Sequence, residues 1–395
     1  MQAVNRKLIR YRNLKKKNGR DMNGSMNKVK RKEVLVVGPW SSTGGVHTFM
    51  RNLGIHSHLN QTWRFERYNI ARPLKITTID NNEYNFLTSD PKRIVKSLYV
   101  TGRNFLKFPR AVLKADIVQL QASDHYAFWE PLAYAKVVKS LGKPAVVRFG
   151  GSFDNFYEAS TPTQQKMIIE ALQIPDALIV LSHGWKDYFG QYVDREKIHV
   201  IPNAVPVPPP MPDRSQREGK PTVLWISGME AKRKGLDTML QLVERLHEQA
   251  NFLFVAVTDQ LRETIEGTGL AKHIELHGIQ IRQQMNQYFY PRADIFMLPS
   301  FGEGFPNSML EAMASGLPTI TTPVGAIPEV LIPNEHGFIN EPTDVDGMHR
   351  DLAYLLDNKE QRLRMGKNSY DLVYSTYSLN AVFAQYDHLW NSKIQ

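Results

Sequence analysis

Residues 299–329 read PSFGEGFPNSMLEAMASGLPTITTPVGAIPE, and this stretch decides the fold. The apolar run Ile295–Leu298 before it is typical of a buried strand, which the glycines after it cannot continue. A helix is then expected to begin near Asn307 or Ser308, because both are good N-cap residues. Gly316 ends that helix within about two turns. The stretch therefore predicts a strand, a glycine-rich loop, a short helix and another strand.

The start of this short helix is a candidate anion site. Its free backbone amides and the positive end of its dipole face the glycine-rich loop, and phosphate is the commonest biological anion at such a site. Glu303 and Glu311 flank this helix end. Two carboxylates would repel a bare phosphate, but they suit a ligand that carries hydroxyls on both sides of a diphosphate. Each hydrogen bond to a charged group contributes roughly 1.5 to 3 kcal/mol. The pattern favours a nucleotide sugar, although a bare pair of glutamates is most often solvent-exposed helix charge.

The longer string EGFPNSMLEAMASGLP, residues 303–318, resembles the donor-site signature of the family 4 retaining glycosyltransferases, also called glycosyl transferases group 1. The resemblance implies that Glu303 contacts the donor sugar and that Glu311 contacts the ribose of the nucleotide. It further implies that the sugar and the diphosphate are held by the residues Gly304, Phe305, Pro306, Asn307 and Ser308. These enzymes have the GT-B fold, in which two Rossmann-like α/β domains face each other across a cleft.

Composition limits the class of protein. A chain of 395 residues with 42% hydrophobic residues is globular and long enough for two domains. It has no cysteine, which excludes a disulfide scaffold, a thiolate metal site and a thiol nucleophile, and which fits a reducing cytoplasm. There is no run of 18 apolar residues and no secretory signal, so we expect a cytoplasmic protein that does not span a membrane.

The net charge of +10 is concentrated at the N-terminus. Residues 1–32 contain 12 Lys or Arg and one acid, which gives +11, whereas the remaining residues sum to −1. We expect this tail to be largely disordered. It is either a solvated extension or a segment that lies on an anionic membrane, such as the inner face of the plasma membrane. A nucleic-acid partner is not expected, because the folded body is nearly neutral.

We predict five segments along the chain: a basic tail at 1–32, an acceptor-side domain at 33–205, a linker at 206–220, a donor domain at 221–376 and a C-terminal helix at 377–395 that crosses back to the first domain. Strands that alternate with helices predict a parallel sheet in each domain, with ligands at the carboxyl ends of the strands. Strands are expected in the first domain at Glu33–Val37, Asp116–Leu120, Ala145–Phe149, Ala177–Leu181 and Ile198–Ile201, and in the second at Thr222–Ile226, Asn251–Val257 and Ile274–His277.

The first domain supplies fewer candidate contacts. Gly44 and Gly45 resemble the glycine loop that family members place between donor and acceptor, although Gly-Gly alone is more often a turn. Relatives often carry a histidine at or next to Phe149, and this sequence has none there. The residues that could replace it are Arg148, Asp154 and His125. A lone histidine such as His125 is more often structural.

A basic loop opens the second domain. Arg233 and Lys234 stand just before a predicted helix, which suits a diphosphate. The loop resembles the donor-phosphate motif of the family, with Lys234 as its lysine, but Met229 stands where an arginine is expected. Arg233 is the candidate for the missing guanidinium; otherwise donor affinity should be weaker. The alternative is a solvated run of charges.

Two further positions follow from the pattern. The resemblance places the nucleotide base near Gly278 and Ile279, mostly through backbone contacts. Asp344 and Asp346 form an Asp-x-Asp sequence, which is a metal motif in another glycosyltransferase fold. Here it stands at a predicted helix start, where capping is the expected role, so we predict no essential metal and no cofactor.

The resemblance implies a hexosyltransferase that moves a sugar from a nucleotide diphosphate sugar to a hydroxyl with retention of configuration. We expect a UDP sugar rather than a GDP sugar as donor. The acceptor is expected to be a glycan or a lipid-linked molecule of bacterial envelope or extracellular polysaccharide synthesis. Two alternatives stay open: a non-catalytic subunit that binds nucleotide sugars, and a GT-B sugar epimerase or phosphorylase.

Overall fold

The computed structural model describes residues 31–40, 45–56, 62–70, 91–123, 126–151, 153–208, 210–228 and 230–394. The predicted tail up to residue 30, Gly44, His125 and Met229 lie outside the described residues. In the part of the chain that is described, no helix combines the length and the apolar character needed to span a bilayer.

The first half of the chain forms a six-stranded parallel sheet of order β2-β1-β3-β4-β5-β6. Its inner strands β3, β4 and β5 are buried at every residue because helices cover both faces of the sheet. The strands are β1 (Lys32–Gly38), β2 (Trp63–Asn69), β3 (Ile117–Ala122), β4 (Ala145–Phe149), β5 (Ala177–Val180) and β6 (Ile198–Val200). The helices between them are α2 (Gly45–His56), α3 (Pro91–Val112), α4 (Tyr126–Ser140), α5 (Phe153–Glu158), α6 (Pro162–Leu172) and α7 (His183–Phe189).

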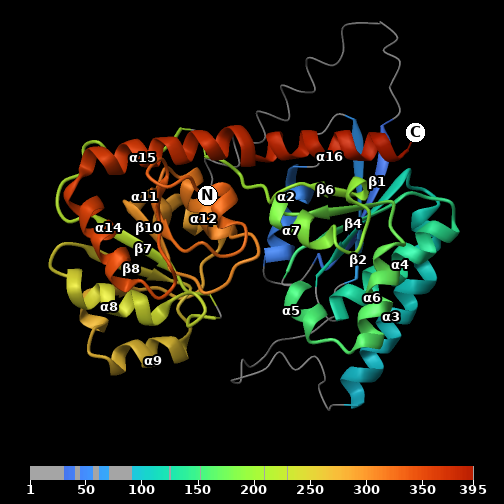
Figure 1. Ribbon diagram of the computed structural model, residues 1–395, viewed down its shortest axis with the longest axis horizontal. Coiled ribbons are helices and arrows are strands. Elements are labelled where there is room, and N and C mark those ends of the chain that lie inside the picture. Colours follow the sequence, from blue (N-terminus) through green and yellow to red (C-terminus); the bar gives the residue numbers. More distant parts are fainter. Residues whose placement is uncertain are drawn as a thin grey trace, which may run out of the picture. The chain divides into compact units, whose positions relative to one another are not determined.

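A second six-stranded parallel sheet, of order β12-β11-β10-β7-β8-β9, follows in the second half (Figure 1). Its strands are β7 (Thr222–Ile226), β8 (Asn251–Val255), β9 (Ile274–Leu276), β10 (Ile295–Leu298), β11 (Thr319–Thr321) and β12 (Gly337–Ile339). Its helices are α8 (Leu236–Leu246), α9 (Asp259–Gly267), α10 (Arg282–Gln284), α11 (Tyr290–Arg292), α12 (Asn307–Ala314), α13 (Ile327–Val330), α14 (Val345–Asp357) and α15 (Lys359–Leu372). The predicted α/β class with two parallel sheets is confirmed.

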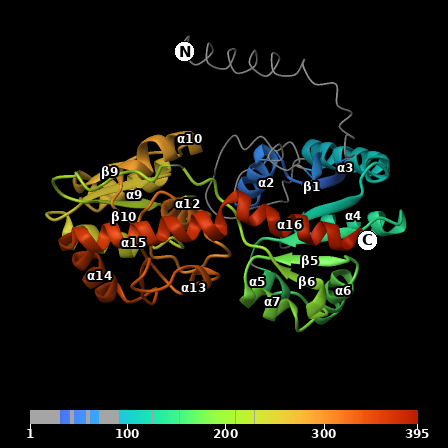
Figure 2. The same cartoon turned by 90° about the horizontal axis from the view of Figure 1, so that it is seen from above.

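The last helix, α16 (Leu379–Lys393), returns to the first sheet, as predicted (Figures 1 and 2). Trp390 is completely buried there, its indole N–H donates to Gln119 on β3 at 3.0 Å, and its ring lies 5.3 Å from that of Trp63. Truncating a buried tryptophan of this kind costs about 3 to 5 kcal/mol. The chain end is therefore part of the first domain's core.

Strand β2 and helix α3 are among the elements of the first domain that were not predicted from the sequence. Strand β2 reads WRFERYN, and all of its residues after Trp63 are half-buried or exposed because it is the edge strand of the sheet. Helix α3 carries exposed apolar residues beside its buried ones. Strand β2 forms the edge of the first sheet opposite β6, and α3 follows it in the chain.

Candidate functional site

The topology of the second sheet fixes where a ligand can bind. From β7 the chain continues to β8 on one side, whereas β10 lies against the other side of β7. In open parallel sheets, ligands bind outside the carboxyl ends of the strands at such a switch in strand order. The loops that leave these two strands are residues 227–235 and 299–306. They are the two loops in which the sequence places the basic cluster and Glu303.

Gly235 allows these two loops to pack against each other. It adopts the left-handed conformation, with φ +82°, and an added Cβ would overlap the carbonyl oxygen of Pro299. Any other residue would be strained there and would push the loops apart. The close approach brings Lys234, the preceding residue, beside Glu303.

Lys234 and Glu303 form a mostly buried ion pair. The Lys234 Nζ donates to Glu303 Oε1 at 2.5 Å, and the Ser300 hydroxyl donates to the same oxygen at 2.7 Å. The side chains are 17% and 7% exposed, respectively. A lysine ammonium has three N–H donors, and the pair occupies one of them. Lys234 is therefore a fixed cation with donors to spare at the carboxyl end of β7.

Arg233 lies at the rim of the same cluster. Its Nε–H donates to Glu230 at 2.5 Å, its Nη1 donates to the carbonyl of Gly302, and Nη1 lies 3.9 Å from Glu303 Oε1. The guanidinium is partly exposed, so it can reach a ligand. The structure thus brings together the three charged residues that the sequence singled out in the two loops.

Helix α12 begins at Asn307, but the predicted N-cap is wrong. Pro306 is the N-cap, and no side chain caps the helix, so Asn307 and Ser308 lie in its first turn. Phe305 before it is buried against Tyr377, which leaves its backbone rather than its ring for a ligand. The amides of the first turn have no intrahelical acceptor and no side-chain cap. This arrangement suits an anion.

The loop after β11 packs against the glycine-rich loop of residues 299–306. The Ala326 N–H donates to the Gly304 carbonyl at 3.2 Å. Gly325 has φ +59°, and a Cβ there would overlap the carbonyl oxygen of Glu303. The backbone of the segment TTPVGAIPE therefore supports the glycine-rich loop by direct contact.

Glu311 has one structural partner for each carboxylate oxygen. Arg282 Nη2 donates to Oε1 at 3.1 Å, and the Tyr290 hydroxyl donates to Oε2 at 3.0 Å. Tyr290 is fully buried, and burial together with the charge of Glu311 raises the pKa of its hydroxyl well above the usual value. It therefore remains a donor at every physiological pH. Each carboxylate oxygen accepts more than one hydrogen bond, so Glu311 is held in place with acceptor capacity left over.

Arg282 and Tyr290 were not predicted from the sequence. Arg282 follows the predicted base loop, in which the Gly278 carbonyl accepts from the Ala256 N–H at 3.2 Å and Ile279 is exposed. Its other nitrogen, Nη1, donates to Asn52 on α2 of the first domain. Its position four residues after Gly278 was the only available signal. Arg282 thus follows the predicted base loop in the chain and contacts both Glu311 and the first domain.

The first domain faces this site with its loop after β4. A Cβ added to Gly304 would lie 4.0 Å from the carbonyl oxygen of Gly151. The Glu329 carboxylate, from the second domain, accepts the N–H groups of His183 and Gly184 at 2.7 and 2.8 Å. These contacts place the loop after β4 beside the glycine-rich loop of residues 299–306, and the start of α7 beside Glu329.

The prediction that Arg148 contacts the sugar is wrong. Its side chain is fully buried, with Nε donating to the Tyr386 hydroxyl at 3.1 Å and Nη1 to Gln121 at 3.0 Å. Nη2 donates to Asn203, and the guanidinium lies 3.7 Å from the ring centre of Phe49. All of its donor groups face protein partners under α16. Arg148 therefore joins the sheet to the C-terminal helix.

The other first-domain candidates differ in how far they can be placed. Asp154 lies in the first turn of α5, just after the β4 loop, and its Oδ1 is buried without a hydrogen-bond partner. Gly45 is the first residue of α2. Gly44 and His125 lie outside the described residues. Asp154 thus remains the first-domain carboxylate closest in sequence to the loop that faces Gly304.

The predicted capping role of Asp344 is confirmed. Its carboxylate accepts the Gly347 N–H at 2.8 Å at the start of α14. Asp346 pairs instead with Arg245 at 2.5 Å. The two carboxylates therefore have separate structural partners.

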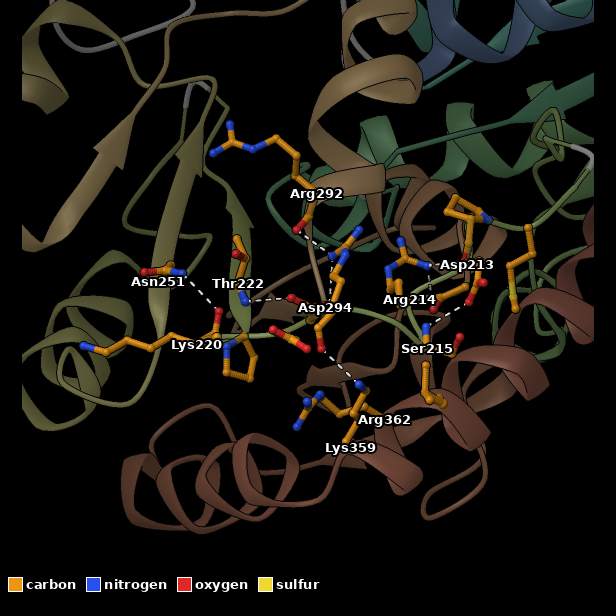
Figure 3. Close-up of a pocket in the computed structure, with 18 of the residues that line it drawn as sticks. Asp213, Arg214, Ser215, Lys220, Thr222, Asn251, Arg292, Asp294, Lys359 and Arg362 are labelled. Carbon is orange, nitrogen blue, oxygen red and sulfur yellow. Dashed lines mark hydrogen bonds and ion pairs between the residues drawn. The ribbon is translucent and has the colours of Figure 1, made fainter.

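A cavity of about 520 Å³ lies elsewhere, between residues 211–222 and α15 (Figure 3). Its basic lining is used by the protein itself. Arg214 donates to the carbonyls of Ala293 and Tyr290 at 2.7 and 2.9 Å, and Arg217 donates to Asp294 at 2.8 Å. Burial beside Arg217 lowers the pKa of Arg214 to about 10. These contacts fasten the predicted linker to the second domain, so the cavity is part of the chain's own packing.

Comparison with known proteins decides the family of the domain that carries this site. Residues 210–372 match the model of the family Glycosyl transferases group 1. Residues 210–372 belong to the glycosyl transferases group 1. The matched residues contain both predicted glutamates, Lys234, Arg282 and Tyr290.

The relatives agree with this assignment. The MMP alpha-(1->4)-mannosyltransferase of Mycolicibacterium hassiacum is 29% identical over 224 residues, which cover 54% of this chain and 53% of that protein. The chain thus spans about half the length of this curated relative. Among solved structures, sucrose-phosphate synthase of Thermosynechococcus elongatus is similar with a TM-score of 0.70 and 18% identity, over 92% of this chain and 99% of that chain. Anabaena HepE in complex with UDP-glucose is similar with a TM-score of 0.65 and 14% identity, over 91% and 99%. The two parallel sheets and the likeness to these structures show the GT-B fold.

Proposed function

We propose that this protein is a retaining glycosyltransferase that moves a sugar from a nucleotide diphosphate sugar to a hydroxyl. The observation that carries the proposal is the convergence of the Lys234–Glu303 pair, the uncapped start of α12 and the held carboxylate of Glu311 around one switch in strand order. A site for a nucleotide sugar needs these three features: a cationic place for the diphosphate and an acceptor group on each side of it. The family of residues 210–372 and the relative named as a mannosyltransferase support it.

The roles of the residues follow from the chemistry. The barrier lies in separating the sugar from the diphosphate, so a catalyst must stabilise the negative charge that grows on the leaving group. In our proposal Lys234, Arg233 and the first amides of α12 do so. Glu311 accepts the ribose hydroxyls, and Glu303 accepts from the sugar. The loop residues Gly304 to Ser308 then hold the sugar and diphosphate mainly through their backbone.

We propose same-face attack as the route to retention. The acceptor oxygen forms a bond to the anomeric carbon on the face from which the diphosphate leaves, and the acceptor proton passes to a diphosphate oxygen. Positive charge from Lys234, Arg233 and the helix end is sufficient for this route, so we propose that transfer needs no metal ion. Transfer should then persist in excess EDTA, and restoration of a lost rate by Mg²⁺ would refute this part.

For the donor we propose a UDP sugar rather than a GDP sugar, in keeping with the UDP-glucose in the similar HepE structure. For the acceptor we propose a glycan or a lipid-linked molecule used in bacterial envelope or extracellular polysaccharide synthesis. The work would then take place at the cytoplasmic face of the membrane, with the basic residues 1–32 near anionic lipid.

Saturation-transfer NMR of the purified full chain against UDP, GDP, ADP and dTDP sugars tests the proposal. We expect selective binding of one nucleotide sugar, which Glu311→Ala loses. If no nucleotide sugar binds at millimolar concentration, the proposed function fails. Turnover of the sugar without any acceptor, or only with phosphate, would point to an epimerase or a phosphorylase.

Binding without turnover, in the presence of a competent acceptor, would point to a non-catalytic subunit.

Glu303→Ala tests the role of the sugar-side carboxylate. We expect binding of the nucleotide diphosphate to survive and transfer to be lost. Full transfer rates in this variant would refute the proposed role of Glu303.

A further inference from the structure

Helix α3 carries a second apolar face that no other element covers among the residues that the structure describes. Three residues of the helix and Leu113, one residue beyond its end, have spacings of four and seven, which align along one side of a helix. They are Val95, Tyr99, Leu106 and Leu113, which are 65%, 68%, 82% and 59% exposed. Among the described residues, five of thirteen exposed large hydrophobic side chains lie between positions 95 and 113. Scattered exposed hydrophobic residues are ordinary, but a continuous stripe on one helix is not.

The opposite face of α3 holds the helix on the protein. Phe108 and Val112 are completely buried, and the ring of Phe108 lies 4.6 Å from that of Tyr134 on α4. The Tyr68 hydroxyl of β2 donates to the Asn104 carbonyl at 2.5 Å. Figures 1 and 2 both show α3 on the outer side of α4. The exposed stripe therefore cannot turn inward to the core.

The flank of the stripe is positively charged. Arg103, Lys107, Arg110 and Lys114 are all exposed and lie within about a third of a turn of the apolar residues. Between residues 91 and 115 the sequence has seven Lys or Arg and no Asp or Glu. Residues 33–395 sum to −1, so the rest of this body sums to −8 once the +7 of residues 91–115 is taken out. A concentrated cationic strip beside an apolar strip is thus specific to this helix.

We propose that the outer face of α3 docks the protein on an anionic lipid surface. Apolar residues that enter the boundary of the acyl chains, with cations beside them at the head groups, are the pattern of helices that lie in a membrane interface. Tyr99 adds an amphipathic ring, which favours the same depth. A second copy of the chain is a poorer occupant, because a two-fold contact would bring two strips without acids together. Nucleic acid would leave the apolar stripe in water.

This docking surface goes beyond the proposed transfer reaction and does not depend on it. Vesicle binding is measured without donor or acceptor, so its failure would leave the transferase proposal untouched. The basic tail at 1–32 is a separate feature of the same chain, and the test must distinguish the two. Docking through α3 would fix the first domain, which we propose takes the acceptor, against the lipid surface.

Flotation of the full chain with vesicles of phosphatidylcholine mixed with phosphatidylglycerol tests the proposal, with pure phosphatidylcholine as comparison. We expect binding to the mixed vesicles that falls with added salt. Replacing Arg103, Lys107 and Arg110 together by Gln should weaken binding roughly a hundredfold, at about fivefold for each cation. Replacing Tyr99 and Leu106 by Asn should weaken it at least about tenfold. These side chains are the most exposed of the stripe, so the fold should be kept.

Matched controls use exposed residues elsewhere. The charge control replaces Lys166, Lys272 and Arg350 by Gln, and the apolar control replaces Tyr354 and Tyr374 by Asn. Both should bind like the wild type. The proposal is overturned if the α3 variants bind as well as these controls, or if replacing Lys15, Lys16 and Lys17 of the tail by Gln abolishes binding while the α3 variants do not weaken it. Sedimentation that shows a dimer of the wild type, lost in Leu106→Asn, without vesicle binding, would instead assign the face to a second copy.

Discussion

Replacing Glu311 by Gln should remove the recognition of ribose while leaving the surrounding structure in place. In the wild type Oε1 faces Arg282 and Oε2 faces the Tyr290 hydroxyl. An arginine can only donate, so the carbonyl oxygen of the new glutamine must stay with Arg282. The amide nitrogen then faces Tyr290, whose hydroxyl can accept. The side chain keeps its position, but it loses its charge and one acceptor.

The size of the effect follows from the two hydrogen bonds that we propose to the ribose. A hydrogen bond to a charged group contributes roughly 1.5 to 3 kcal/mol, against about 0.5 to 1.5 kcal/mol for a neutral pair. Two ribose hydroxyls therefore lose about 2 to 3 kcal/mol together. This difference corresponds to a rise in the Kd of the donor of about thirty- to a hundred-and-fiftyfold.

The assay compares two ligands with two proteins. Titration calorimetry gives the Kd of the preferred nucleoside diphosphate and of its 2′-deoxy analogue for the wild type and for Glu311→Gln. Wild type should bind the analogue less tightly, whereas Glu311→Gln should bind the two ligands almost equally. Glu360→Gln, an exposed change on α15, is the control. If the loss of the 2′-hydroxyl weakens binding by the same factor in both proteins, Glu311 does not contact the ribose.

Three further changes probe other parts of the molecule. Lys234→Met should lower the transfer rate by about a hundred- to a thousandfold, because the leaving group loses its fixed cation. Binding of the nucleoside, which carries no phosphate, should not change. An unchanged transfer rate would remove Lys234 from the mechanism. Arg148→Met should lower the free energy of unfolding by about 2 to 4 kcal/mol, because the Gln121 Oε1 and the Tyr386 hydroxyl lose the buried donor that they share. The donor Kd should not change; urea unfolding and calorimetry measure the two quantities. Burial, together with nearby Lys393 and Lys186, lowers the pKa of His199 from 6.5 to about 4. The unfolded chain then binds a proton at His199 that the folded chain does not bind, so the free energy of unfolding should fall by on the order of 2 kcal/mol as the pH drops from about 6.5 to 4. His199→Gln should flatten this part of the plot of unfolding free energy, measured with urea, against pH.

Apolar runs between turn residues were predictable from the sequence alone. The predicted strands Ala145–Phe149, Thr222–Ile226 and Ile295–Leu298 agree in both bounds with β4, β7 and β10. Central strands of a parallel sheet are buried on both faces, so their sequences carry a strong local signal. The edge strand β2 carries no such signal, because one side of it meets water.

The helix that opens the candidate site illustrates a smaller error. Asn and Ser favour the N-cap, but Pro306 takes that position and places both inside the first turn. Proline at the cap is set by the direction in which the loop leaves β10, which local propensity does not contain. The consequence favours the proposed chemistry, since no side chain competes for the first amides.

Sequence by itself determined the α/β class, the two sheets, the crossing helix and the adjacency of the basic loop to Glu303. The class and the sheets follow from local patterns, and the edge that carries the ligand follows from the rule that parallel strands end at the same edge. The crossing helix and the place of the basic loop beside Glu303 were implied by the resemblance to the glycosyltransferase family. Only the tertiary structure decided which neighbours each side chain meets. Side chains alternate along β4, so Arg148 points to the face opposite Val147 and Phe149, and α16 covers that face from more than two hundred residues away. Arg282 and Tyr290 meet Glu311 for the same reason: the contact joins segments whose separation no local pattern encodes.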